Sequence, residues 1–248
     1  MVNRRIIALL LLSAVLLSVA CALAMAETTA EISQEPEKTE IEERAEAAIG
    51  HFTDDPDAIE RAAGSVVKLE VYDAQDNKIG TGSGFCAFDS SVLITAAHVI
   101  VNMDHIIATC DDGACFRLEA AVGGDEDSDT AWFRLPEGME LIPLSVSSET
   151  PRRGEKILAI GSQFGIVNLV TLGNIAGVWK SQGMDWLLFT APVSSGSSGG
   201  PILNNNGEVV GVVSGTYDKG QNLNVATPID RIQAILSPEI RMGVTENE

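Results

Sequence analysis

The stretch APVSSGSSGGPIL, residues Ala191–Leu203, holds four serines and three glycines between an apolar approach and an apolar exit. Gly196 lies two positions before Ser198, and Gly199 and Gly200 follow it directly. Glycine adopts positive φ freely and lets a substrate approach the backbone closely. A flexible linker would not be followed at once by an apolar run and a hairpin signal. The pattern therefore predicts a rigid loop that holds one serine, Ser198, in place.

Short β-branched and apolar runs, separated by glycine and polar turns, continue on both sides of this loop from about residue 62 onward. Regularly spaced short strands are typical of an all-β sandwich or barrel. Asn205-Asn206-Gly207 predicts a hairpin directly after the loop, with a turn that needs positive φ at both central positions. Three prolines between residues 136 and 151 interrupt the strand series near its middle. We therefore expect a two-lobed all-β protein that ends in a short helix near Ile232–Leu236.

The first 26 residues are typical of an export signal. Arg4 and Arg5 precede an uncharged run, and Ala24-Met25-Ala26 has the small-x-small pattern of a cleavage site. We predict a cleaved signal peptide or an uncleaved membrane anchor over residues 1–26. A third alternative is lipidation of Cys21, although Leu17 lies one position too early for a typical lipidation box. All three place the remaining chain outside the cytoplasm: in the periplasm, in the medium or anchored on the outer side of a membrane.

The charge of the chain argues against two classes of partner. The formal net charge is −19 at pH 7, or −21 without Arg4 and Arg5, which disfavours binding to nucleic acids and to anionic lipid surfaces. Residues 27–57 are acidic and have no sustained apolar period, so we predict a disordered tether there. The folded domain is expected over residues 58–238, with a short tail at 239–248.

Two residues earlier in the chain are candidates to activate Ser198. His98 lies in the run VLITAAHVI, at the end of an apolar strand, where a buried structural histidine would be the default reading. Asp129 is the last acid before the apolar run TAWFRL, and a carboxylate that enters a core needs a partner. A serine hydroxyl is a poor nucleophile until a base accepts its proton, and a third group must orient that base. We therefore predict Ser198 as the nucleophile, with backbone N–H groups of Gly196 and Ser198 facing the developing negative charge. His105 is expected at the surface.

Two other readings of these residues are weaker. The spacing of Asp125, Asp127 and Asp129 resembles calcium ligands, but the glycine and the distal glutamate of an EF-hand loop are missing. We therefore expect no metal and no cofactor. Ser194, Ser195 and Ser197 are rival nucleophiles, which we expect to be loop or cleft-wall residues.

Three motifs carry a resemblance to a known family. TAAHV, SDTAWFRL and GSSGGP, in the order His, Asp, Ser, resemble the chymotrypsin-like (trypsin-like) serine peptidases. GTGSGFCAF and GEKILAIGSQFGIVNLVTLGNIAGV resemble the Deg/HtrA branch of that family, and the resemblance covers about Ala62 to Leu236. It implies two six-stranded antiparallel β-barrels with the site in the cleft between them.

The resemblance also implies roles for single residues. It implies His98 as the general base, Asp129 as its orienter and Ser198 as the nucleophile. It implies an oxyanion hole made by the amides of Gly196, Ser197 and Ser198. The primary specificity pocket is expected to be lined by Pro192, Val213, Ser214 and Val225. None of these four is charged, so we expect a preference for small or aliphatic substrate side chains.

Two departures from the family matter. Ser197 stands where digestive relatives have an aspartate that receives a newly freed N-terminus, and where Deg/HtrA relatives commonly have asparagine, so activation by that ion pair is not expected. Deg/HtrA proteins usually carry a PDZ domain, and too few residues follow Leu236 for one. Peptide-tail sensing through such a domain is therefore not expected.

Two cysteines flank a four-residue turn. Cys110 and Cys115 enclose Asp111-Asp112-Gly113-Ala114, and we expect a hairpin that places the two thiols opposite each other, within disulfide reach. An exported protein permits such a bond, whereas two reduced thiols are the alternative. Cys86 is expected to be a small buried apolar residue.

These observations predict an exported serine endopeptidase that acts on unfolded or misfolded polypeptides. The alternative is a non-catalytic module that binds peptides in the same cleft, which would have no need of all three reactive residues. An esterase usually has the order Ser, Asp, His on a different scaffold, which is not the order here.

Overall fold

The computed structural model describes residues 52–181, 183–217 and 222–236. The predicted export segment at 1–26, most of the predicted tether and the tail at 239–248 lie outside the described residues. Within the described ranges, no helix has the length and apolar character needed to cross a bilayer.

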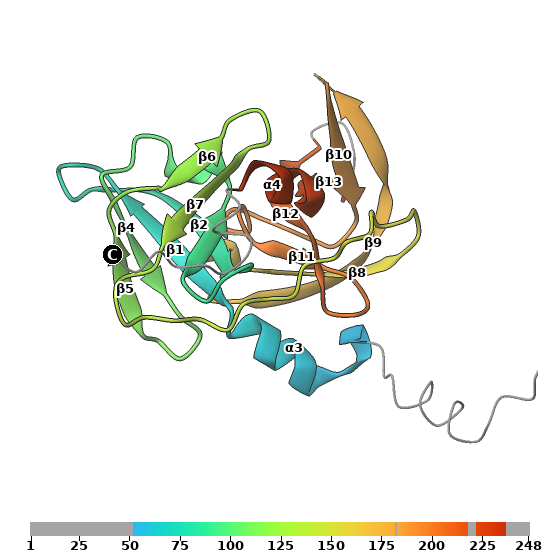
Figure 1. Cartoon of the computed structure of the whole chain (residues 1–248), viewed down its shortest axis with the longest axis horizontal. Coiled ribbons are helices and arrows are strands. Elements are labelled where there is room, and N and C mark those ends of the chain that lie inside the picture. Colours follow the sequence, from blue (N-terminus) through green and yellow to red (C-terminus); the bar gives the residue numbers. More distant parts are fainter. Residues whose placement is uncertain (1–51, 182, 218–221, 237–248) are drawn as a thin grey trace, which may run out of the picture. The chain divides into compact units, whose positions relative to one another are not determined.

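The first half of the described chain forms one antiparallel sheet of seven strands (Figure 1). Its strand order is β5-β4-β1-β2-β3-β7-β6. Alternating side chains of β1 and of its neighbours point into one core, because successive residues of a strand face opposite sides of the sheet. The strands are β1 (Val66–Tyr72), β2 (Lys78–Cys86), β3 (Val92–Thr95), β4 (His105–Thr109), β5 (Cys115–Leu118), β6 (Gly123–Asp125) and β7 (Thr130–Arg134).

The second half forms a closed barrel with the order β10-β13-β12-β11-β8-β9. The hairpin predicted at Asn205-Asn206-Gly207 joins β11 to β12, and Gly207 has φ 77°. Asn206 does not have positive φ, so the turn is not the type we expected. The strands are β8 (Lys156–Gly161), β9 (Leu169–Ser181), β10 (Met184–Phe189), β11 (Pro201–Leu203), β12 (Val209–Thr216) and β13 (Asn224–Pro228).

The predicted architecture of two barrel-like β halves and a short terminal helix is confirmed. Helix α4 (Ile229–Ile235) follows β13 and packs on the strands. The first half differs from the expectation in detail, because it has seven strands and is not closed by hydrogen bonds. A shared core joins the two halves: Phe85 and Ile94 of the first sheet belong to the same apolar cluster as Leu158, Leu203 and Val212 of the barrel.

The folded part of the chain includes residues 52–57, which we predicted as the end of the tether. These residues form a 3₁₀ turn, η1 (Phe52–Asp54), and the start of helix α3 (Pro56–Ala63). Asp55 caps the helix, since its Oδ1 accepts hydrogen bonds from the amides of Asp57 at 3.0 Å and Ala58 at 3.1 Å. The backbone amide of Phe52 donates to the carbonyl of Asn205 at 2.9 Å. The boundary predicted at residue 57 between tether and folded domain is therefore wrong. The acidic composition of this segment suggested disorder, although the segment contains the cap and the start of a helix.

The register predicted for the two hairpin cysteines is wrong. Cys115 pairs with Thr109, and the amide of Cys110 donates to the carbonyl of Ala114 at 2.8 Å. A shift of one residue moves a side chain to the other face of a strand, so Cys110 is buried while Cys115 is exposed. The predicted disulfide is not formed, because Cys110, Cys115 and Cys86 are free thiols in the described structure. Burial raises the pKa of the Cys86 thiol to about 12, which fits the apolar role expected for it.

His105 is buried, contrary to the surface position we expected. Its ring stacks on Tyr72 with centroids 5.1 Å apart. Its Nδ1 lies 3.1 Å from Oδ2 of Asp104. The prediction failed because the paired strand β1 supplies the aromatic ring that covers this side chain.

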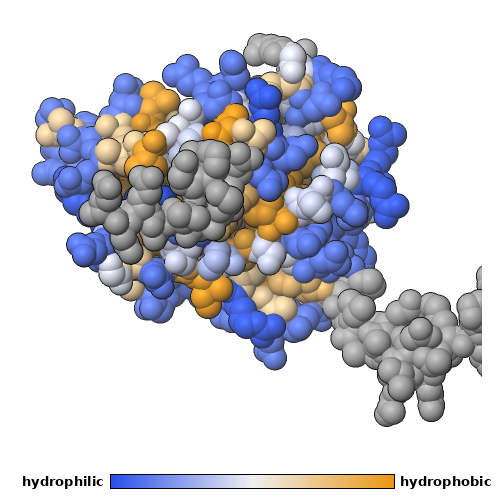
Figure 2. Space-filling model, viewed as in Figure 1, coloured by the Kyte–Doolittle hydropathy of each residue, from blue (hydrophilic) through white to orange (hydrophobic). Residues whose placement is uncertain are grey.

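Most of the rim of the face in Figure 2 is hydrophilic, with smaller apolar areas between.

Candidate active site

His98 and Asp129 are brought together by neighbouring strands of the first sheet. His98 lies in the 3₁₀ turn η2 (Ala97–Ile100) that follows β3, and Asp129 directly precedes β7. Thr95 at the end of β3 pairs with Ala131 at the start of β7. The amide of Ala97 donates to the carbonyl of Asp129 at 3.1 Å, so the turn and the loop are tied together by backbone.

The Asp129 carboxylate holds the His98 ring from one side. His98 Nδ1 lies 2.8 Å from Oδ2 and 3.0 Å from Oδ1 of Asp129. Oδ1 also accepts the backbone N–H of His98 at 2.9 Å. An ionised carboxylate only accepts hydrogen bonds, so this arrangement favours the tautomer with the proton on Nδ1. The unprotonated Nε2 is then free to act as a base.

The same contact sets the proton affinity of the histidine. The hydrogen bond that His98 donates to the Asp129 carboxylate raises the pKa of His98 above its usual range, against the opposing effect of partial burial. Asp129 has φ 50°, a left-handed backbone conformation that is uncommon outside glycine. Backbone strain of this kind concentrates at functional sites.

The acidic loop before Asp129 has partners of its own. Asp125 Oδ2 accepts hydrogen bonds from the amide and the hydroxyl of Ser128. Asp129 faces His98 instead, so these two carboxylates of the calcium-like spacing serve different partners. Across the described ranges, no three His, Cys, Asp or Glu side chains gather as metal ligands would.

The loop that carries Ser198 needs its glycines. Gly196 has φ 98° and Gly199 has φ 84°, both in the region that disfavours a side chain. A Cβ atom at Gly196 would collide with the carbonyl oxygen of Ser162, and one at Gly199 with the side chain of Thr95. The loop is therefore packed tightly against both halves of the protein, as expected for a rigid serine-bearing loop.

Every carbonyl from Ser194 to Ser198 accepts a hydrogen bond. Three donors are backbone amides of the loop itself or of the β8–β9 connection, and two come from Ser83. The acceptor–donor pairs are Ser194 O with Ser197 N (2.9 Å), Ser195 O with Phe164 N (2.9 Å), Gly196 O with Ser83 Oγ (2.7 Å), Ser197 O with Gly200 N (3.0 Å) and Ser198 O with Ser83 N (2.8 Å). With all five carbonyls held, the orientation of each peptide plane in the loop is fixed.

The amides of the loop are used differently from one another. The amide of Ser197 donates to the carbonyl of Ser194 inside the loop. It is therefore not free to serve the oxyanion hole in which we predicted it. The amides of Gly196 and Ser198 donate to no acceptor among the described residues. Two fixed N–H groups that have no acceptor within the protein are the arrangement that stabilises an oxyanion.

The four serines of the loop have different surroundings. Ser197 is 2% exposed, and its hydroxyl accepts a hydrogen bond from the amide of Ser194 at 3.2 Å. Ser198 is partly exposed and Ser195 is exposed. Among the described residues no hydrogen bond joins Ser198 Oγ to His98, but Gly199 packs against Thr95 and Ala96 on the strand end that leads to His98.

The residues predicted for the specificity pocket are not equivalent in the structure. Val213 is 1% exposed and belongs to the apolar cluster of the closed barrel. Pro192 is exposed, Ser214 is partly exposed and Val225 is 9% exposed.

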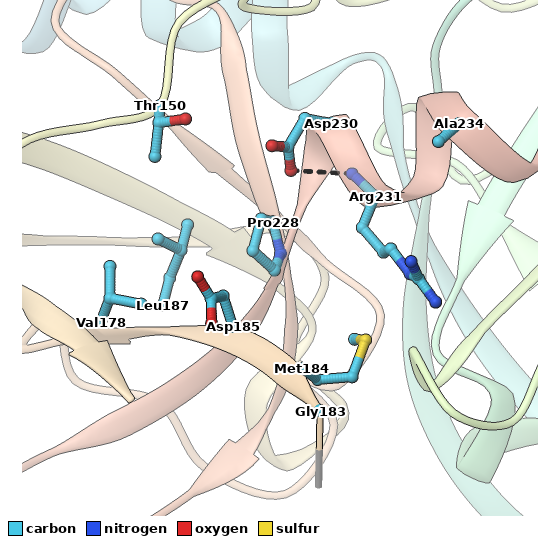
Figure 3. Close-up of a pocket in the computed structure, with 10 residues that line it drawn as sticks. All are labelled: Thr150, Val178, Gly183, Met184, Asp185, Leu187, Pro228, Asp230, Arg231 and Ala234. Carbon is cyan, nitrogen blue, oxygen red and sulfur yellow. Dashed lines mark hydrogen bonds between the residues drawn. The ribbon is translucent and has the colours of Figure 1, made fainter. Parts of the chain in front are cut away.

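One cavity borders the His98–Asp129 pair. Its volume is about 530 Å³. Ile100, Val101 and Ala121 form an apolar wall, and Asp125 and Glu126 form an acidic one. A second cavity, of about 360 Å³, lies between the β9–β10 hairpin and α4 (Figure 3). Met184, Leu187 and Pro228 line this second cavity, and it contains none of the predicted site residues.

Two buried hydroxyl groups near the site were missed from the sequence. Thr227 of β13 is fully buried, donates to the carbonyl of Ser128 at 2.6 Å and lies 3.1 Å from Ser214 Oγ. It thereby ties the closed barrel to the residue before Asp129. Ser83 is the other, and its position in the glycine-bracketed GTGSGF motif was the signal that could have identified it.

Comparison with known families gives one match over the centre of the chain. Residues 82–212 match a family described as a trypsin-like peptidase domain. This range contains His98, Asp129 and Ser198.

Curated relatives are similar over most of the described residues. The chain is 30% identical over 196 residues to "Serine protease HTRA1A" of Danio rerio, which covers 73% of this chain and 40% of the relative. It is 33% identical over 167 residues to "Putative serine protease HhoA" of Synechocystis sp., which covers 63% of this chain and 42% of the relative. The chain thus spans about two fifths of the length of these relatives.

Two solved structures share the fold. One, described as the serine endoprotease from Yersinia pestis, gives a TM-score of 0.65 at 26% identity, over 75% of this chain and 66% of that chain. The other, described as HtrA-type protease AlgW with tripeptide, gives a TM-score of 0.66 at 26% identity, over 75% of this chain and 63% of that chain.

Proposed function

This chain belongs to the trypsin-like peptidase family, in its HtrA branch, and from that premise we propose that it is a serine endopeptidase that uses Ser198, His98 and Asp129. The observation that carries the proposal is the hydrogen bond between His98 Nδ1 and the Asp129 carboxylate, at 2.8 Å. A histidine held in this way presents its other ring nitrogen as a base. The glycine-bracketed loop supplies the serine that such a base would activate.

The first half of the reaction forms an acyl-enzyme. His98 Nε2 takes the proton of the Ser198 hydroxyl as Oγ attacks the carbonyl carbon of the substrate. The negative charge that develops on the carbonyl oxygen is stabilised by the amides of Gly196 and Ser198. The tetrahedral intermediate collapses when His98 gives its proton to the leaving amine, so the peptide bond breaks and an ester to Ser198 remains.

The second half returns the enzyme to its starting state. Water gives a proton to His98 and attacks the ester carbonyl, and Ser198 Oγ leaves and recovers the proton. Asp129 stays ionised throughout and stabilises the transient imidazolium on His98. The raised pKa of His98 serves this step, because it favours the charged ring.

We propose unfolded or misfolded polypeptides as the substrates and the exterior of the cytoplasm as the location. An endopeptidase of this fold needs an extended substrate segment, which unfolded chains supply. The location rests on the export signal predicted at residues 1–26. The negative charge of −19 gives nucleic acids no electrostatic attraction to the protein.

A fluorophosphonate probe separates this function from a non-catalytic peptide-binding module on the same fold. We expect the probe to label Ser198, because Oγ forms a bond to phosphorus as fluoride leaves and His98 takes the proton. Unfolded casein should be cleaved by the same preparation. Heat-denatured protein is the control and should not be labelled. Binding of casein without labelling and without cleavage would instead support the binding module.

We expect the enzyme to prefer an aliphatic residue on the acyl side of the cut. Pro192, Ser214 and Val225 carry no charge, and an incoming lysine or arginine would lose water without gaining a partner. Burying an unpaired charge costs several kcal/mol, whereas one methylene in an apolar pocket changes discrimination by about 1–3 kcal/mol. The measurement is the digestion of a peptide library, with cleavage sites read by mass spectrometry.

The control for this specificity experiment is ionic strength. A protein of charge −19 attracts basic peptides over long range, and salt screens that attraction while leaving pocket chemistry largely unchanged. Lysine or arginine dominating the acyl-side position at high salt would show that an acid lines the pocket.

A further inference from the structure

We infer that Ser83 is a positioning residue for the oxyanion hole, an inference that rests on the proposed peptidase function. Ser83 lies on β2 of the first sheet and is fully buried. Its hydroxyl donates to the carbonyl of Gly196 at 2.7 Å and accepts the amide of Ser162 at 2.8 Å. One side chain thus joins the serine loop to the connection that follows β8.

The backbone of Ser83 fixes the same loop a second time. Its amide donates to the carbonyl of Ser198 at 2.8 Å. Its carbonyl accepts the hydroxyl of Thr95 at 2.7 Å. The amide, the carbonyl and the hydroxyl of Ser83 are therefore all in use, and two of these three groups hold the first and the last carbonyl of the segment Gly196–Ser198.

The two carbonyls that Ser83 holds flank the peptide unit that carries the Ser198 amide. That amide shares its plane with the Ser197 carbonyl, and the units before and after it contain the Gly196 and Ser198 carbonyls. Since each peptide unit is planar, holding both neighbouring carbonyls restricts the rotation of the unit between them. Ser83 therefore helps to orient the Ser198 amide of the proposed oxyanion hole without contacting the substrate.

Among the described residues, the Ser83 hydroxyl is the only side-chain group that bonds the Gly196 carbonyl. Ser162 Oγ is buried and has no hydrogen-bond partner among the described residues, and it is not bonded to Gly196. Without the Ser83 hydroxyl, the Gly196 carbonyl and the Ser162 amide would both lose their partner in a buried place. Buried backbone groups are nearly always paired, so we expect the loop to shift until they are.

The variant Ser83→Ala removes this link and keeps the backbone contacts of β2. We expect kcat to fall by about 10-fold to 100-fold, because small misplacement of catalytic groups has effects of this size. KM should stay within about twofold, since the hole acts on the transition state and not on the bound substrate. The pH at which activity is half-maximal should not move, because Ser83 makes no contact with His98.

The matched control is Ser65→Ala. Ser65 is also a buried serine of the first half, but its hydroxyl has no hydrogen-bond partner among the described residues. We expect this variant to keep the kcat of the wild type. Circular dichroism and melting temperature of both variants show that each is folded.

A peptide boronate gives a readout that a purely structural role would not move. The boronate forms a tetrahedral anion on Ser198 that occupies the oxyanion hole, whereas a product peptide binds the cleft without one. Ser83→Ala should weaken boronate inhibition by the same factor as kcat and leave product inhibition unchanged. Should Ser83→Ala fail to fold, Ser83→Cys tests the same link, because a thiol is a weak hydrogen-bond donor and acceptor.

The outcomes separate the two proposals. If the wild-type protein cleaves casein, and if Ser83→Ala has the same kcat and the same boronate affinity as Ser65→Ala, the role of Ser83 is overturned. The peptidase function is then unaffected. A rise in KM at constant kcat would also overturn the role of Ser83. A wild-type protein that neither cleaves casein nor reacts with fluorophosphonate would overturn both.

Discussion

Replacing Ser198 with alanine is expected to lower kcat for an unfolded protein substrate by on the order of 10⁶-fold. The change removes the proposed nucleophile, and the residues that would have activated it act as a unit with it. Ser198 is only partly buried and its hydroxyl makes no hydrogen bond to the described residues, so the melting temperature should change little. The measurement is casein turnover together with a thermal melt.

Ser195→Ala is the matched control, because Ser195 lies three residues earlier in the same loop and is exposed. We expect it to retain activity and fluorophosphonate labelling. Activity lost in Ser195→Ala and retained in Ser198→Ala would assign the nucleophile to the other serine.

The second large effect is expected from Asp129→Asn, which should lower kcat by on the order of 10⁴-fold. The Asn side chain can donate a hydrogen bond to His98 Nδ1, which places the ring proton on Nε2, where it blocks the base. Asp127→Asn removes the same charge from the neighbouring loop and is expected to keep nearly full activity. Equal losses in the two variants would mean that charge, and not the contact with His98, matters.

The pH dependence gives this prediction a second readout. Activity requires neutral His98, so kcat/KM should rise with pH through the pKa of this histidine in the free enzyme. Asp129 raises that pKa. Removing its charge lowers the pKa, so the acid limb of the residual activity should move to lower pH in Asp129→Asn. A limb that stays in place would show that another group controls it.

Local patterns predicted the elements that depend on local rules. The two-lobed β architecture followed from short alternating runs with turns between them, and the hairpin after Ser198 followed from Asn206-Gly207. The glycines around Ser198 indicated a constrained loop, and the structure explains them by positive φ and close backbone contacts.

The errors concern features that are set by partners distant in sequence. The register of the β4–β5 hairpin decides which face each cysteine takes, and a single position in the pairing separated Cys110 from Cys115. The amide of Ser197 was assigned to the oxyanion hole, but a turn within the loop uses it as the donor to the Ser194 carbonyl. Such a turn has no strong sequence pattern.

The seating of the serine loop against Ser83 and Thr95 constrains when the protein can become active during synthesis. The strands that hold His98 and Asp129 are complete at Arg134, and the strand β12, whose Val213 contacts the loop through Gly199 and Gly200, ends only at Thr216. A growing chain on the ribosome therefore carries the base long before it carries a supported nucleophile. Vectorial synthesis therefore delays a supported nucleophile until the second half of the domain has been made and has docked.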